Sequence, residues 1–196
     1  MVRVVSLEGI DGSGKSFLVD RVESGLLLKG VEVVRLPSRY FFSRYHKGLS
    51  DAEVEQLQQD DKKHVYDKHV AKGTRVMLCD RAEVSQKVYN GTVNTSIESD
   101  KVIYLDIEVE KALERVNIRG EDDNLGFESK TILEAKKKEY ERILKSDKYR
   151  NKVDWVKVEG NGYRLGEGIY HSLDAMVFHV VCTVYSEYEK EVYEKV

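Results

Sequence analysis

A glycine-rich stretch near the start of the chain contains the residue types that bind a polyphosphate. Residues 9–16 read GIDGSGKS, which matches the pattern G-x-x-x-x-G-K-[ST]. In this pattern backbone N–H groups converge on phosphate oxygens at a helix amino terminus, the lysine reaches the β and γ oxygens, and the hydroxyl binds Mg²⁺. The residues expected to bind a nucleoside triphosphate are therefore Gly9, Asp11, Gly12, Ser13, Gly14, Lys15 and Ser16.

Such a stretch must join a strand to a helix, and the residues on either side predict both. Residues 2–7 form a valine-rich apolar run, and residues 18–26 repeat apolar side chains at helical spacing. Short apolar runs recur along the chain, and most are β-branched and lack polar alternation, which is typical of buried parallel strands. The five expected strands are residues 2–7, 31–35, 76–79, 102–106 and 153–158.

Helical patterns separate these strands. Ser50 and Glu53 have the spacing of a capping box, and Ser129 is placed to cap a further helix. From about Glu167 a wide apolar face predicts a last helix that packs on the sheet. Because strands that alternate with helices form right-handed crossovers, we expect an α/β fold. The expected architecture is a P-loop three-layer sandwich, with a five-stranded parallel sheet, helices on both faces and a short lid.

Length, charge and cysteine content limit the remaining classes. The 196 residues suit a single domain over residues 1–196, and the 32 Lys and Arg against 35 Asp and Glu leave a net charge of -3. This charge argues against nucleic acid as the main partner. Cys79 and Cys182 lack the spacing of a zinc site or disulfide framework. With no leader and no run of 18 apolar residues, we expect a cytoplasmic protein, neither secreted nor in a membrane.

Two short motifs are similar to those of GTP-binding switch proteins. Residues 123–126 read DNLG and residues 151–154 read NKVD. In a switch protein both would follow the carboxyl end of a strand, where α/β sheets bind ligands. Here the first lies between two predicted helices and the second enters a predicted strand, so we interpret both as coincidental.

Several segments together resemble the thymidylate kinases. The run SLEGIDGSGKS, residues 6–16, is similar to the opening of that family. Residues 35–39, RLPSR, resemble its Arg-x-Pro-x-Arg segment, and Asp80 and Arg81 resemble its D-R-[YFH] motif. Residues 85–91, SQKVYNG, resemble S-x-x-A-Y-Q-G, residues 119–129 resemble the lid, and Tyr140 falls in the helix that follows. The resemblance covers about residues 1–145, and the ordered set is more specific than the phosphate loop alone.

The resemblance implies Mg²⁺-dependent transfer of the γ-phosphoryl group of ATP to a nucleoside monophosphate, with dTMP to dTDP as the first choice, by a homodimer. It places the lid at about residues 119–128 and the acceptor-binding segments at about 35–50 and 80–91. The implied catalytic residues are Lys15, Arg81 and Arg119, the metal site is Ser16 and Asp80, and the acceptor site is Asp11, Arg39, Arg81, Ser85, Gln86 and Tyr89.

These residues suit the chemistry in their own right. ATP and a monophosphate are both anions, so cations must stand beside each. Arg39 and Arg81 can clamp the acceptor phosphate, and Arg119 can neutralise the group in transfer. No general base is required, because the acceptor oxygen is already anionic. By resemblance, Asp11 contacts the 3′-hydroxyl of the sugar, Gln86 faces the pyrimidine and Tyr89 crowds the 2′ position.

Departures from the family pattern leave alternatives. The aromatic of D-R-[YFH] is Ala82, the usual lid arginine is Asn124, and residues 57–64 hold no aromatic to stack on thymine. In that window Lys62 or Lys63 is a possible substitute for the arginine that reads the base. The acceptor can instead be another pyrimidine nucleotide, or a deoxynucleoside, which would need a carboxylate base such as Glu8 or Glu83. A third alternative is a degenerate member that binds nucleotide as a regulator.

Simpler structural roles also exist for the candidate residues. They are a solvated face for Arg39, a strand-end ion pair for Asp80 and Arg81, a helix cap for Ser85, core packing for Tyr89 and a helix-terminal position for Arg119.

Overall fold

The computed structural model describes residues 2–36, 49–74, 76–93, 97–118, 129–159, 162–165, 170–171 and 173–193. In order, these residues form β1 (Arg3–Glu8), α1 (Lys15–Leu28), β2 (Val34–Leu36), α3 (Asp51–Ala71), β3 (Val76–Asp80), α4 (Glu83–Asn90), β4 (Lys101–Ile107), α5 (Val109–Ile118), α6 (Lys130–Leu144), β5 (Val153–Glu159), β6 (Gly162–Leu165), β7 (Tyr170–His171) and α7 (Leu173–Tyr193).

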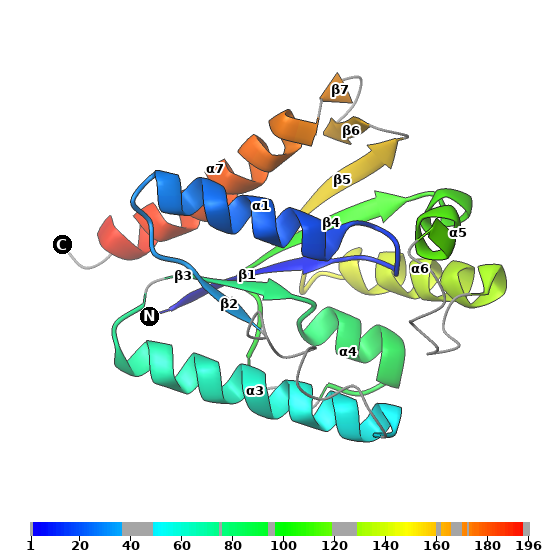
Figure 1. Ribbon diagram of the computed structural model, residues 1–196, viewed down its shortest axis with the longest axis horizontal. Coiled ribbons are helices and arrows are strands. Elements are labelled where there is room, and N and C mark those ends of the chain that lie inside the picture. Colours follow the sequence, from blue (N-terminus) through cyan, green and yellow to red (C-terminus); the bar gives the residue numbers. More distant parts are fainter. Residues whose placement is uncertain are drawn as a thin grey trace.

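The strands form one sheet with the order β2-β3-β1-β4-β5-β6-β7 (Figure 1). The first five of these strands are parallel to one another, which confirms the expected five-stranded α/β fold. Strands β6 and β7 extend the sheet antiparallel beyond β5 and were not predicted. Their sequences, GYRL and YH, are too short to form an apolar run that marks a strand.

The central strand β1 is buried on both faces. Because side chains alternate along a strand, neighbours in β1 enter different cores. Val5 and Leu7 belong to the larger hydrophobic cluster, whereas Val4 packs in a second cluster with Leu36 and Met77. This double burial explains why β1 lacks the polar alternation of a half-exposed strand.

Helices cover both faces of the sheet, as expected. Helices α1 and α7 lie together on one side, and α3 and α4 lie on the other (Figure 1). A Cβ atom on Gly25 would come within 2.9 Å of Val181 Cγ2, so the glycine in α1 permits the close approach of α7. Val180, Val181 and Val184 of α7 are buried, which confirms the predicted packing of this helix on the sheet.

The predicted helix starts are only partly correct. Ser50 N donates to Glu53 Oε2 at 2.8 Å at the start of α3, and Ser129 Oγ accepts from Ile132 N at 3.3 Å at the start of α6. The last helix begins later than predicted, at Leu173, because residues 170–171 pair with β6 as strand β7. No helix in the described part of the chain is both long and apolar enough to cross a membrane.

Candidate nucleotide-binding site

The phosphate loop lies at the carboxyl edge of the sheet, between the end of β1 at Glu8 and the start of α1 at Lys15. Gly12 has a φ of +78°, and a Cβ atom there would lie 2.2 Å from Ala112 O, so no other residue fits without moving α5. Gly9, with a φ of +148°, also packs closely, since an added Cβ atom would lie 2.9 Å from Leu105 O. Contacts with β4 and α5 therefore fix the shape of the loop.

Lys15 is folded into the loop that precedes it. Its Nζ donates to Gly9 O at 2.9 Å, to Ile10 O at 2.8 Å and to Ser13 Oγ at 3.2 Å. Burial and, to a smaller extent, the nearby charge of Arg81 lower the pKa of the amine to about 7, against the opposing effect of Asp11. Because a phosphate group beside the amine would favour its charged form, the loop is suited to bind an anion.

Ser16 and Asp80 place two oxygen atoms together beside the loop. The pairing of β1 with β3 sets Leu7 opposite Asp80, which brings the carboxylate to the first turn of α1. Ser16 Oγ donates to Asp80 Oδ2 at 2.8 Å, and Arg35 Nη2 lies 3.9 Å from the same oxygen. A hydroxyl and a carboxylate are hard oxygen donors, which are the ligands that Mg²⁺ prefers when phosphates and waters complete its shell.

Arg81 follows Asp80 with an unusual backbone conformation. Its φ of +64° is in the left-handed region, and no other described non-glycine residue has a positive φ. Arg81 N donates to Leu7 O at 3.1 Å, and Arg81 O accepts from Lys62 Nζ at 2.6 Å and from Cys79 Sγ at 3.1 Å. Three hydrogen bonds therefore hold a strained residue at the site, where such strain is often functional.

The buried side chain of Lys62, from α3, thus holds the backbone of Arg81 through its hydrogen bond to Arg81 O. The other possible base reader, Lys63, pairs with Asp67 at 2.6 Å on an exposed face of the same helix.

The guanidinium of Arg81 meets Asp11 and Tyr89. Arg81 Nη2 donates to Asp11 Oδ1, and its Cζ lies 4.6 Å from the centre of the Tyr89 ring. Tyr89 OH donates to Asp11 Oδ2 at 2.6 Å. Burial alone would raise the pKa of Asp11, but the charges of Arg81 and Lys15 and the bond from Tyr89 lower it to about 2. Asp11 is therefore a carboxylate at any physiological pH.

A fourth side chain, Lys136, joins this cluster from α6. Its Nζ lies 3.7 Å from the centre of the Tyr89 ring, and its position lowers its pKa to about 8, chiefly through burial. Lys136 lies in the helix expected after Ser129, but it was not among the predicted site residues. The available signal was its spacing of four residues before Tyr140, since residues four apart share a helix face.

Glu8 lies just before the loop in a different environment. The side chain is fully buried, accepts from Ala82 N at 2.7 Å and from the hydroxyl of Ser85, and lies 3.5 Å from Tyr140 OH. Burial raises the pKa of Glu8 to about 7. Ser85 was expected to bind the acceptor, but its hydroxyl contacts Glu8 and Tyr140 inside the core.

Glu83, the other carboxylate considered as a base, also binds core groups. Its Oε2 accepts from Ser99 Oγ at 2.8 Å, and its Oε1 accepts from Tyr149 OH at 3.2 Å. Neither Glu8 nor Glu83 is therefore directed at the cluster of Asp11, Arg81 and Tyr89.

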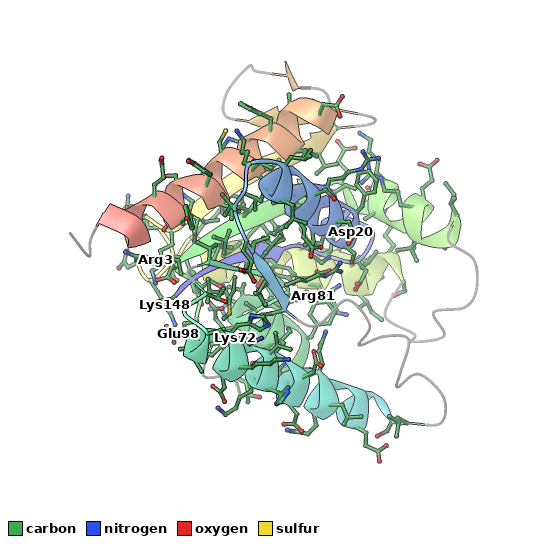
Figure 2. All side chains as sticks on the ribbon, turned by 60° about the vertical axis from the view of Figure 1, so that its left-hand side comes forward. Arg3, Asp20, Lys72, Arg81, Glu98 and Lys148 are labelled. Carbon is green, nitrogen blue, oxygen red and sulfur yellow. The ribbon has the colours of Figure 1, made fainter. Side chains whose placement is uncertain are left out.

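The structure brings together Asp11, Lys15, Ser16, Asp80, Arg81 and Tyr89 from the expected residues at one edge of the sheet. In Figure 2 Arg81 lies toward the middle of the view, whereas Arg3, Glu98 and Lys148 lie together toward the other end of the strands. Gln86 is buried on α4, next to Ser85. Arg39 and Arg119, with residues 37–48 and the lid at residues 119–128, lie outside the described residues.

The second GTPase-like motif has a structural role. Asp154 in β5 accepts from Lys101 Nζ at 2.6 Å, and Lys152 Nζ donates to Ser99 O at 3.3 Å. Both side chains therefore tie β5 to the segment around β4, at the end of the sheet opposite the phosphate loop.

The parallel sheet and the glycine-rich loop between β1 and α1 define a protein of the P-loop class. A solved structure of deoxyadenosine kinase from M. mycoides, with dCMP and dCDP as products, has a similar fold, with a TM-score of 0.57 and 20% identity over 93% of this chain and 99% of that one. The family model for thymidylate kinase matches residues 7–155. The chain belongs to the thymidylate kinase family, whose members are phosphotransferases.

Two curated relatives support this assignment. A thymidylate kinase from Akkermansia muciniphila is 32% identical over 160 residues, which cover 68% of this chain and 75% of that protein. A thymidylate kinase from Desulfotalea psychrophila is 27% identical over 157 residues, which cover 67% of this chain and 77% of that protein.

Proposed function

We propose that this protein transfers the γ-phosphoryl group of ATP to a nucleoside monophosphate, with dTMP as the preferred acceptor. The observation that carries the proposal is that Lys15 and Arg81 lie next to the same carboxylate, that of Asp11. Lys15 belongs to the phosphate loop, and Arg81 follows the end of β3. The triphosphate of ATP in the loop and an acceptor phosphate bound to Arg81 would therefore meet beside Asp11. The names of the two curated relatives support dTMP.

Ser16 and Asp80 would hold Mg²⁺ with the phosphates of ATP. Their oxygens are already adjacent, and Asp80 is nearly buried, so little rearrangement of the protein is needed. The bound metal neutralises charge on the donor phosphates.

Each residue of the cluster then has a distinct role. Lys15 binds the β and γ oxygens of the donor, and Arg81 offers two parallel N–H groups to the acceptor phosphate. Asp11 orients Arg81 and is placed to bind a sugar hydroxyl, while Tyr89 holds Asp11 and lines the sugar site. Arg39 and Arg119 remain predicted phosphate ligands. Catalysis by this set depends on positioning and charge neutralisation rather than on a base.

The test is an acceptor panel with ATP and Mg²⁺. ADP production is measured with dTMP, dUMP, dCMP and thymidine, and we expect the highest kcat/KM for dTMP. Lys15→Ala should abolish ADP production and leave the circular dichroism spectrum unchanged. Tight binding of ATP without acceptor-stimulated ADP production would support the regulatory alternative instead, and turnover of thymidine alone would support a deoxynucleoside kinase. Homodimerisation stays a prediction, which sedimentation at micromolar concentration tests.

A further inference from the structure

Two cations, Lys136 and Arg81, lie close to the ring of Tyr89. Lys136 Nζ and Arg81 Cζ lie 3.7 Å and 4.6 Å from the centre of the Tyr89 ring. The hydroxyl of the same ring binds Asp11 at 2.6 Å. Lys136 therefore belongs spatially to the cluster of Arg81, Tyr89 and Asp11, although it comes from a helix that follows the lid segment.

The packing of α6 directs Lys136 into the site. Tyr140, one turn further along, is fully buried and lies 2.6 Å from Ser85 Oγ, so it fixes the rotation of the helix. The neighbouring lysines have other environments: Lys137 donates to Ile107 O at 2.8 Å and pairs with Asp106, and Lys138 is exposed. Of these three consecutive lysines, only Lys136 lies over Tyr89.

The cluster contains more positive than negative charge. Lys15, Arg81 and Lys136 all act on the single carboxylate of Asp11 and help to lower its pKa to about 2. Without a ligand, the positive charges of Lys136 and Arg81 repel each other. An anion that contacts both groups would offset this repulsion.

The predicted lid segment contains few cations of its own, so a further cation from α6 would help to neutralise the phosphates. Residues 119–128 read RGEDDNLGFE, with one basic residue, Arg119, against four acidic ones. A segment of this charge supplies little neutralisation to two phosphate groups that approach each other.

We propose that Lys136 binds the phosphate of the acceptor nucleotide together with Arg81, so that α6 supplies a cation to the acceptor site. This inference rests on the proposed kinase function, and it adds a residue that recognises the phosphate rather than the base or the sugar.

The test compares Lys136→Met with Lys138→Met, a matched control on the exposed side of the same helix. For Lys136→Met we expect a rise of about tenfold or more in the KM and Kd for dTMP, because a charge-assisted hydrogen bond contributes about 1.5–3 kcal/mol. The KM for ATP and the Kd for thymidine, which lacks the phosphate, should change less than about twofold in the same variant. Lys136→Arg should restore most of the affinity for dTMP, and Lys138→Met should behave as the unchanged protein.

The outcomes separate this inference from the proposed function. If the unchanged protein phosphorylates dTMP and Lys136→Met has the same KM, the inference is wrong and the kinase function stands. The same conclusion follows if Lys136→Met lowers only the melting temperature, because Lys136 would then act solely by packing on Tyr89. If the unchanged protein phosphorylates no monophosphate, the proposed function itself fails.

Discussion

Glu8 and Asp11 lie three residues apart on either side of the first glycine turn, yet their surroundings have opposite effects on their charge. Glu8 is enclosed by the core, and burial raises its pKa to about 7. Asp11 is also largely enclosed, but Arg81, Lys15 and Tyr89 lower its pKa to about 2. Burial raises the pKa of both carboxylates, so the difference comes chiefly from the charges of Arg81 and Lys15 beside Asp11, with a further contribution from the Tyr89 hydrogen bond.

This contrast separates two functions within one short segment. Glu8 binds Ala82 N and Ser85, which attaches the end of β1 to the start of α4 and so holds the sheet edge in shape. Asp11 binds groups that a substrate could also contact. Substitutions of Glu8 or its partners should therefore lower the free energy of unfolding, and substitutions of Asp11 or its partners should lower the rate of turnover.

The largest expected effect is that of Arg81→Ala. Loss of the guanidinium should lower kcat/KM for the acceptor by about 100- to 1000-fold, the range found when one preorganised charge donor is removed. The KM for ATP should change little. Steady-state kinetics with each substrate varied in turn measures both effects. An equal loss for ATP and acceptor would contradict the assignment of Arg81 to the acceptor.

Arg81→Gly is the matched control for backbone strain. Glycine adopts a φ of +64° without the cost of about 1–2 kcal/mol that other residues incur. Arg81→Gly should therefore unfold at a higher urea concentration than Arg81→Ala and be equally inactive. Equal stability of the two variants would show that this backbone is not strained.

The next largest effect is that of Glu8→Ala on stability. The substitution leaves Ala82 N without its acceptor and opens a cavity, so we expect a loss of about 3 kcal/mol in the free energy of unfolding. Glu8→Gln, which keeps the shape and one acceptor oxygen, should lose less. Urea denaturation gives both values. A stable but inactive Glu8→Ala would instead make Glu8 a catalytic group.

The two carboxylates should also respond to pH in opposite directions. The pKa of Glu8 is raised from 4.5 to about 7 in the folded protein, so the folded state holds a proton that the unfolded state has lost. The contribution of Glu8 to stability is thus greatest below pH 4.5 and declines as the pH rises to about 7. Asp11, with a pKa lowered from 3.8 to about 2, contributes above pH 3.8 and loses this contribution toward pH 2.

Urea denaturation across pH tests these directions. From pH 5 to 7.5 the stability of Glu8→Gln relative to the unchanged protein should rise by about 2 kcal/mol. Asp11→Asn should show no such trend in this window, because Asp11 is ionised throughout it in both states. A rising trend for Asp11→Asn would show that the two environments are not distinct.

The smallest expected effect is that of Ser129→Ala. Ser129 Oγ caps α6, which carries Tyr140 to the Glu8 side and Lys136 to the Asp11 side. Loss of a serine cap costs about 1 kcal/mol of stability. We expect a slightly lower melting temperature with unchanged kcat, measured by thermal denaturation and steady-state kinetics. A large loss of turnover would show that the start of α6 takes part in the reaction.

Local sequence patterns determined much of the fold. The five parallel strands, the capped starts of α3 and α6 and the position of the phosphate loop follow from apolar spacing, capping residues and glycines, because these features depend on neighbours only a few residues away. Strands β6 and β7 have no such local pattern, and their pairing depends on the edge that β5 offers.

The site was determined only in part by the sequence. The motifs located Lys15, Asp80 and Arg81, since each follows a recognisable strand. Only the tertiary structure assigned Ser85 to the buried Glu8 and brought Lys136 to Tyr89. These contacts join residues 47 to 77 positions apart, and the order β3-β1-β4 with α4 and α6 packed together creates them. Whether a carboxylate is charged or neutral depends on such distant neighbours, and so spacing along the chain does not encode it.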